Sequence, residues 1–371
     1  MVIVFNCSPE AKRALDEVMQ RGEYRDYSDI INAAIMNFAV LTAEVDAGGA
    51  IVLSGQPPVV ERSPGHPTEA VAKEPVLEYG SPRPIPTPTI PDIFSAAKLP
   101  AEPPAALAEL PPIAVAPGHA AALDRWIFGQ FSKLLPIKAT CRALANLTLT
   151  EHGGFHVEKV AGQIAQEAAA LGTFLAAHDK RHGLIRDDAM ATGFPDAGEH
   201  GDRSRLRYAN QFVAALSKQG QLSGLLAEYR LINLIGGRGQ RIQLTRPGWD
   251  FAVLPNPVLD AAQASPSERL SAEERGFLID HISNSVPVED FAFNTIIAYV
   301  SRGLTTPEQL DSAVKKLPAK SGISASFVTT QRSGLISRMA DLGLISRIRD
   351  GVRVTYHVTE AGEAYAARPA A

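Results

Sequence analysis

The sequence predicts a mainly α protein with small β elements, built from several consecutive units. Three observations carry this prediction: a strand-and-helix segment at the N-terminus, a proline-rich stretch after it, and an internal repeat in the C-terminal two thirds. The chain has 371 residues, which exceeds one ordinary domain. We expect four segments, which cover residues 1–50, 51–120, 121–262 and 263–371.

Composition excludes several classes of protein. Hydrophobic residues make up 45% of the chain and charged residues 20%, so most of it can form a packed core. The two cysteines, Cys7 and Cys141, are too few for a disulfide scaffold or a zinc ribbon. The apolar runs are short and the N-terminus has no basic leader, so we expect neither a membrane span nor a signal peptide. These features predict a cytoplasmic protein.

The net charge of −4 conceals a local asymmetry. Residues 1–50 carry 4 basic and 8 acidic side chains. Residues 203–246 carry eight Lys or Arg against Glu228 alone, and residues 315–353 carry eight against Asp341 and Asp350. Two basic stretches in a mildly acidic chain indicate a polyanionic partner, with a solvated surface as the alternative.

The first 45 residues form a small unit of one strand and two helices. Residues 2–7 have the β-branched and aromatic content of a strand. Ser8 and Pro9 begin a helix that ends at Gly22, and Ser28 caps a second helix with apolar residues at helical spacing. A unit this small cannot bury a core alone, so we expect it to pair with a second copy.

This order of elements resembles the ribbon-helix-helix family over residues 2–44. The resemblance implies a homodimer whose N-terminal strands pair into a ribbon, and in the family the ribbon reads bases in the major groove. Here the strand is mainly apolar, only Asn6 offers a base contact, and the acidic charge of the unit opposes phosphate. We therefore expect the unit to dimerise rather than to read bases.

A proline-rich stretch follows. Pro82, Pro84, Pro86 and Pro88 alternate with other residues, and further prolines continue to Pro117. Proline removes backbone donors and opposes helices and sheet ladders. We expect residues 51–120, most clearly 57–118, to form a disordered, flexible linker that lets the two ends of the protein move independently.

The strongest signal is a repeat that relates residues 222–248 to residues 335–362. The offset is 113 residues in the helix and 114 after the hairpin. Each copy predicts an amphipathic helix, a hairpin and a closing helix, with Asp350-Gly351 as the second hairpin turn. The first copy differs because Arg230 stands where the second has Gly343, and because its turn is rich in glycine.

Further helices are expected before each copy, and the capping residues Ser271 and Thr306 begin two of them. The expected helices cover residues 157–178, 205–219, 271–283, 288–302 and 306–317, with a loop at 190–202.

Residues 337–362 resemble the recognition helix and wing of winged-helix regulators of the MarR and ArsR type. The resemblance implies two winged-helix domains that bind double-stranded DNA, with base contacts from the helix and phosphate or minor-groove contacts from wing arginines. The expected base-reading residues are Thr330, Gln331, Arg332, Ser333 and Ser337 in the second copy and Ser217, Lys218, Gln219 and Gln221 in the first. The expected wing residues are Arg347, Arg349, Arg353, Arg238 and Arg241. For each arginine alone, a solvated strand residue is the alternative.

The sequence carries no enzyme signature. It has no phosphate-binding loop ending in Lys-Ser/Thr, no Gly-x-Ser-x-Gly, no His-Glu-x-x-His and no Cys-x-x-Cys. His178 and His182 have the i,i+4 spacing of some metal sites, but neutral surface histidines are commoner. We expect no catalytic residue, no cofactor and no metal.

These observations together predict a sequence-specific, homodimeric DNA-binding protein associated with the nucleoid, most simply a transcriptional regulator. Two alternatives stay open. Plasmid replication initiators also carry two winged helices, and partition (centromere-binding) proteins also use ribbon-helix-helix dimers. Condensin-associated adaptors use tandem winged helices to hold a protein, and they would have apolar wings, whereas the wings here are basic.

Overall fold

The computed structural model describes residues 89–104, 106–112, 126–196, 198, 201–236, 240–260, 268–317, 320, 323–351 and 353–368. The unit predicted for residues 1–50, and the linker up to residue 88, lie outside the described residues. The chain divides into two units, Met1–Pro82 and Arg83–Ala371, and every described residue belongs to the second.

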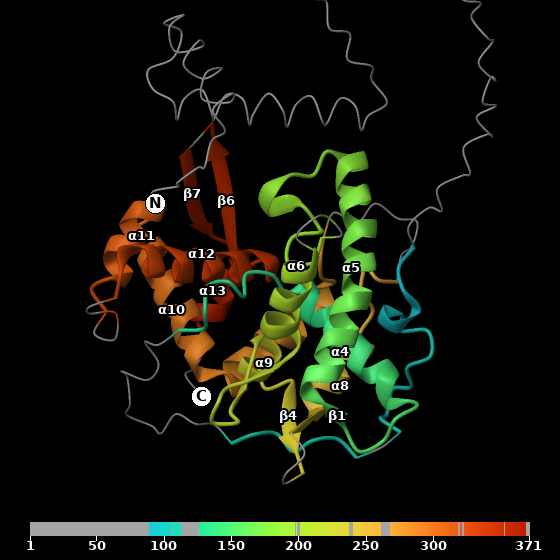
Figure 1. Ribbon diagram of the computed structural model, residues 1–371. Helices are drawn as coiled ribbons and strands as arrows, with labels where there is room; N and C mark the ends of the chain where they lie inside the picture. Colours follow the sequence, from blue (N-terminus) through green and yellow to red (C-terminus); the bar gives the residue numbers. More distant parts are fainter. Residues whose placement is uncertain are drawn as a thin grey trace, which may run out of the picture. The chain divides into compact units, whose positions relative to one another are not determined.

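The described part is mainly helical with small sheets, which confirms the predicted fold class at that level (Figure 1). No helix within the described ranges is long and apolar enough to cross a bilayer. The first half contains η1 Asp92–Phe94, α4 Leu135–Thr148, β1 Phe155–His156, α5 Val157–His182, η2 Arg186–Asp188, α6 Gly201–Tyr208, η3 Ala209–Val213, β2 Ala215–Leu216, β3 Leu222–Ser223, α7 Leu225–Glu228, β4 Ile232–Ile235, β5 Arg241–Leu244 and α8 Arg246–Val253. The second half contains α9 Ala272–Ser285, α10 Pro287–Ser301, α11 Pro307–Val314, α12 Ala325–Asp341, β6 Ile345–Asp350, β7 Arg353–Val358 and α13 Glu360–Ala366.

The first half surrounds a three-stranded antiparallel sheet. The strand order is β1-β5-β4, so the short strand before α5 lies at one edge and the β4–β5 hairpin completes the sheet. Helices α4 and α8 pack against each other beside it. Thr245 caps α8 by accepting a hydrogen bond from Gly248 N, and Pro247 lies in the first turn, where its missing N–H costs nothing.

In the second half, helices α9, α11 and α13 and the hairpin begin where the sequence predicts them. Ser271 and Thr306 form capping boxes that begin α9 and α11, and Thr359 caps α13. Strands β6 and β7 pair from Ile345↔Val358 to Asp350↔Arg353 around the predicted turn. The segment before α11 lies beside β7, because Tyr356 N donates a hydrogen bond to Thr305 O at 2.8 Å.

Both copies of the repeat have the same local geometry where the helix gives way to the hairpin. Arg230 (φ 57°) and Gly343 (φ 76°), which are 113 residues apart, both adopt the left-handed conformation that terminates a helix. In each copy a capping threonine hydroxyl donates to the carbonyl of that residue, Thr245 at 2.8 Å and Thr359 at 2.6 Å. The left-handed conformation costs an arginine more than a glycine, so the first copy carries strain that the second avoids.

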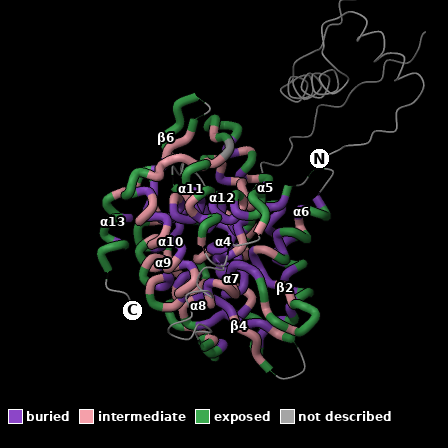
Figure 2. Tube along the Cα trace, turned by 90° about the vertical axis from the view of Figure 1, so that its left-hand side faces the viewer, coloured by how far each residue is buried: buried purple, intermediate pink, exposed green. Residues whose placement is uncertain are grey.

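The two halves share one hydrophobic core (Figure 2). A buried ion pair of the second half makes contacts with the first: Arg338 on α12 contacts Glu289 on α10 at 2.5 Å and donates to Phe131 O of the first half at 2.6 Å. Tyr229 of the first half donates to the same carboxylate at 3.0 Å. Because each buried charge has several partners, these contacts fix the relative orientation of the halves.

Residues 89–112 differ from the flexible linker expected for residues 51–120. Phe94 is completely buried, and Asn146 Nδ2 donates to the carbonyls on both sides of it. Farther along, Trp249 Nε1 donates to Ala101 O at 3.1 Å and Gln243 Nε2 donates to Ala106 O at 2.5 Å. Side chains of the first half thus donate to backbone carbonyls along this proline-rich segment, which holds it against the core.

Candidate nucleic-acid interface

Helix α12 turns a different face outward from the one predicted. Gln331 is 2% exposed and accepts a hydrogen bond from Lys320 at 2.7 Å. Arg332 is also buried: its Nε contacts Asp311 at 2.9 Å and its Nη1 donates to the Tyr356 hydroxyl at 3.1 Å. Ser337 is buried as well. The expectation that these three residues face DNA is therefore wrong for this conformation, and they instead support the fold.

Helix α12 also has a second contact face. The apolar residues of α12 predict one buried face, but the segment 126–134 covers another. A Cβ at Gly334 would lie 1.9 Å from Gly129 O, and a Cβ at Gly129 would lie 1.9 Å from Thr330 O, so only glycines allow this approach. The sequence does not predict this contact, because the two glycines are isolated and far apart along the chain.

The outward face of α12 carries small hydroxyl side chains. Ser326, Thr329 and Ser333 are exposed at spacings of three and four residues, and Thr330 is half-buried beside them. Thr329 donates to Asp311 at 2.8 Å, so part of this row is held in place. Of the five residues predicted on this helix, Thr330 and Ser333 remain available for a base or phosphate contact.

The wing arginines divide between two faces of the β6–β7 hairpin. Arg347 and Arg349 point toward η2, where both contact Asp187 Oδ2, at 3.0 Å and 2.5 Å. Arg353 is exposed on the other face, near Ile348, which is 53% exposed. Side chains alternate across a strand, so the spacing of two between the first pair places both on the Asp187 side.

The four residues predicted on the first recognition helix do not lie on a helix. They occupy the β2–β3 turn, because the helix expected over 205–219 ends as α6 at Tyr208 and as a π-helical turn, η3, at Val213. The Ser217 hydroxyl accepts hydrogen bonds from Gln219 N and Gln221 N, a side-chain turn that competes with helix. Ser217, Lys218, Gln219 and Gln221 are all exposed.

The first wing offers little that is free for DNA. Arg238 lies outside the described residues. Arg241 donates to Gly154 O and contacts Glu151 at 3.3 Å. In this part of the chain, the arginine thus ties β5 to the loop before β1.

Sequence reasoning missed the outward face of α6 and η3. Arg203, Leu206, Arg207 and Asn210 are exposed and follow the i, i+3, i+4, i+7 spacing of one helix face. Leu206 is 62% exposed. Arginine and asparagine are the side chains that bond guanine and adenine edges bidentately. That spacing is visible in the sequence, whereas the repeat begins only at residue 222, after this face.

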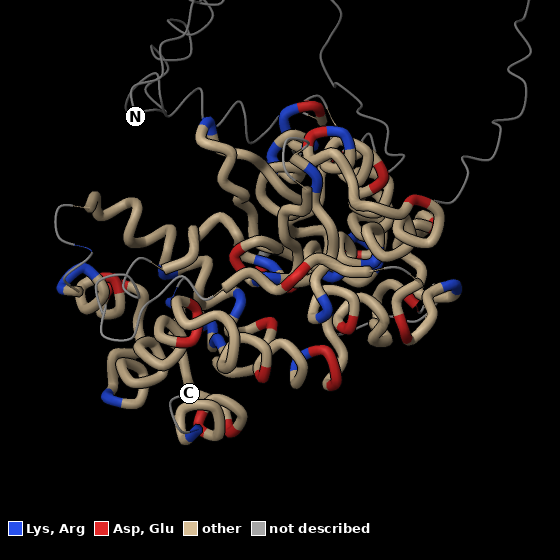
Figure 3. The backbone as a smooth tube through the Cα atoms, turned by 90° about the horizontal axis from the view of Figure 1, so that it is seen from below, with Lys and Arg blue, Asp and Glu red and all other residues tan. Residues whose placement is uncertain are grey.

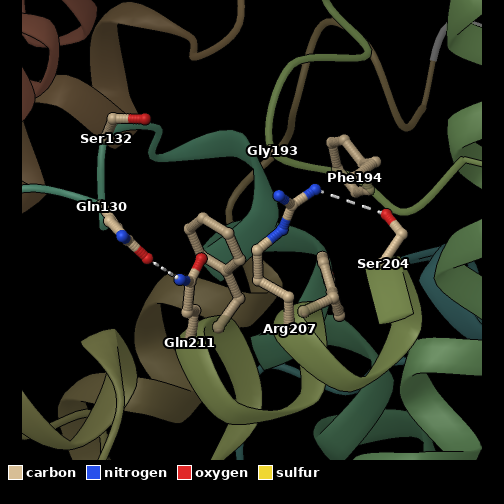
Figure 4. Close-up of a pocket in the computed structure, with 9 residues that line it drawn as sticks. Gln130, Ser132, Gly193, Phe194, Ser204, Arg207 and Gln211 are labelled. Carbon is tan, nitrogen blue, oxygen red and sulfur yellow. Dashed lines mark hydrogen bonds between the residues drawn. The ribbon is translucent and has the colours of Figure 1, made fainter. Parts of the chain in front are cut away.

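A pocket opens beside this face, between α6–η3 and the segment that covers α12 (Figure 4). Its volume is about 300 Å³. Gln211 Nε2 donates to Gln130 Oε1 at 2.6 Å across one side, and Arg207 reaches Ser204 Oγ at 3.5 Å on the other. The lining residues are Gln130, Ser132, Gly193, Phe194, Ser204, Arg207, Tyr208, Gln211 and Phe212.

In Figure 3, Lys and Arg positions are interspersed with Asp and Glu positions along the described backbone. A contact with a polyanion would therefore depend on a few positions. The His178 and His182 rings lie 4.4 Å apart, and the described residues contain no group of three or more metal-ligating side chains.

Comparisons with protein-family models, with curated proteins and with solved structures found no match to this chain.

Proposed function

We propose that this protein is a homodimer that binds double-stranded DNA sequence-specifically and regulates transcription. The observation that carries the proposal is the unit formed by α12 and the β6–β7 hairpin. Its exposed hydroxyl row, with Thr330 and Ser333, lies next in the chain to a wing with the exposed Arg353. A helix of short polar side chains followed by a basic hairpin is the arrangement of winged-helix DNA readers.

Helix α6 supports the same proposal in the first half. Its outward Arg203, Arg207 and Asn210 are base- and phosphate-binding side chains. The strand order β1-β5-β4 with a β4–β5 hairpin fits a winged-helix sheet. The two units would then form tandem winged helices over 121–262 and 263–371, joined where Phe131 O and Tyr229 bond to the Arg338–Glu289 pair, while residues 1–50 supply the dimer.

The test is selection of duplexes from a random-sequence library by the full-length protein, followed by binding to the selected and a scrambled duplex. We expect an enriched motif with two related half-sites and a selected duplex bound at least ~10³-fold more tightly than the scrambled one. Sedimentation of the full-length protein should give a dimer. No enrichment over the input library would contradict the proposal.

An adaptor that holds a protein partner is a second candidate. The exposed Ile348 on the wing and the exposed Phe327 on α12 favour it, as does the pairing of Arg347 and Arg349 with Asp187, which reduces the basic character of the wing. If it is correct, Ile348→Ser will abolish capture of a partner protein while duplex selection returns no motif.

A further inference from the structure

We propose that the pocket beside α6 is a phosphate-binding site, with Arg207 as its cation. Only the source of the phosphate, the DNA backbone, rests on the proposed function. The same chemistry would also accept a free phosphorylated small molecule. The site itself is argued from the side chains that line the pocket.

The guanidinium of Arg207 is available for an anion. Within the described part of the chain, its one hydrogen bond is a long one, 3.5 Å, to Ser204 Oγ. The neighbouring Asp202 is paired with Arg205 instead, so it does not neutralise Arg207. Arginine presents several N–H donors in a planar fork that matches phosphate oxygens.

Neutral donors complete the site. The Ser204 hydroxyl already accepts from Asp196 N at 3.2 Å and from Arg207, so its proton can point toward a ligand. Gln130 uses its oxygen to accept from Gln211, which leaves its own amide protons as donors. Ser132 adds a further hydroxyl to the lining (Figure 4). No Asp or Glu side chain lines the pocket.

The backbone is shaped for this arrangement. The π-helical turn at Ala209–Val213 follows α6 directly, and Gln211 within it lies on the pocket, as Arg207 does one turn earlier. π-helical turns are rare and occur frequently at functional sites. Gln130 and Ser132 come from the segment packed on α12, so a phosphate bound here would connect α6 and η3 to that segment.

The experiment measures binding of the full-length protein and its variants to selected and random duplexes over a range of salt concentrations. Arg207→Ala should weaken both complexes by a similar factor and lower the slope of log K against log salt by about one unit. Arg207→Lys should keep the slope but weaken binding, because the charge remains and the fork is lost. Lys159→Ala, an exposed charge removal on α5, is the control and should change neither.

A second arm titrates the parent and Arg207→Ala with inorganic phosphate and pyrophosphate, followed by thermal unfolding. Stabilisation of the parent that Arg207→Ala loses, without any effect of the variant on duplex binding, would identify a small phosphorylated molecule as the source. If Arg207→Ala matches Lys159→Ala on duplexes and on free phosphates, the site is refuted. If the parent binds free phosphate through Arg207 but binds no duplex, the proposed function fails and the site stands.

Discussion

At the scale of single residues, Asp187 pairs with two of the wing arginines for which we propose phosphate contacts. Its carboxylate contacts both Arg347 and Arg349. Burial alone would raise the pKa of Asp187, but Arg347, Arg349 and Lys133 together lower it below its ordinary value. The lowered pKa favours the charged carboxylate, which would compete with a bound phosphate for the same two arginines.

Asp187→Asn should strengthen duplex binding, because it releases both wing arginines. Partly exposed ion pairs contribute ~0.2–1 kcal/mol each, so for the two pairs we expect a gain of about two- to thirtyfold in affinity. The measurement is fluorescence anisotropy on a selected duplex. Asp188→Asn in the same short helix removes an equal charge from an exposed side chain and serves as the control. Equal effects of the two variants would argue against a specific contact.

Arg332 should act on stability rather than on base discrimination. Arg332→Ala removes its hydrogen bonds to Asp311 and Tyr356, and we expect a loss of about 2–3 kcal/mol in the free energy of unfolding. Ser333→Ala, on the exposed face one residue later, should change it by less than ~0.5 kcal/mol. Urea denaturation measures both. If Arg332→Ala retains the parent's stability but loses its DNA preference, the helix turns a different face outward in the complex.

At the scale of elements, α12 is positioned by the contact of two glycines. Gly334→Ala would gain helix propensity, yet its Cβ would clash with Gly129 O, so we expect a net loss of ~1–3 kcal/mol. Gly276→Ala on α9 is the matched control, because no atom lies within 4 Å of its added Cβ. That substitution should stabilise the protein by ~0.5–1 kcal/mol. Equal gains at both sites, measured by thermal unfolding, would show that the segment 126–134 does not pack on α12 in solution.

How far the sequence predicts each element depends on how local its cause is. The helices that begin at Ser271, Thr306 and Thr359 were predicted because their caps are local. The outward face of α12 was not, since it depends on Gly129, more than 200 residues earlier. The helix expected over 205–219 ends earlier than predicted. The Ser217 side chain accepts hydrogen bonds from the backbone of the following turn, and this local alternative to helix was not predicted.

At the scale of the whole molecule, buried polar groups couple the halves to each other and to pH. His281 on α9 donates from Nε2 to Tyr229 O at 2.7 Å, which joins the second half to the first. Burial lowers the pKa of His281 below its ordinary value of 6.5, which favours the neutral imidazole in the folded protein. As pH falls below 6.5, His281 is protonated more readily in the unfolded chain than in the folded protein, and this difference favours unfolding.

The free energy of unfolding should therefore fall between pH 7.5 and pH 5.5, and His281→Gln should make that dependence shallower. Urea denaturation at both values measures it. Exposed His152→Gln is the control and should follow the parent. A parent stability that is constant across this range, or a dependence that His281→Gln leaves unchanged, would refute the role of His281.

We propose that DNA contacts α6–η3, the exposed face of α12 and the β6–β7 wing. Hydrogen–deuterium exchange of the full-length protein, with and without a selected duplex, tests it most directly. The account predicts slower exchange on DNA binding at residues 203–211, at the N-terminal half of α12 and in the hairpin, with no change in α8 or α13. Slower exchange confined to residues 1–50, or absent from all three elements while the duplex is bound, would contradict it.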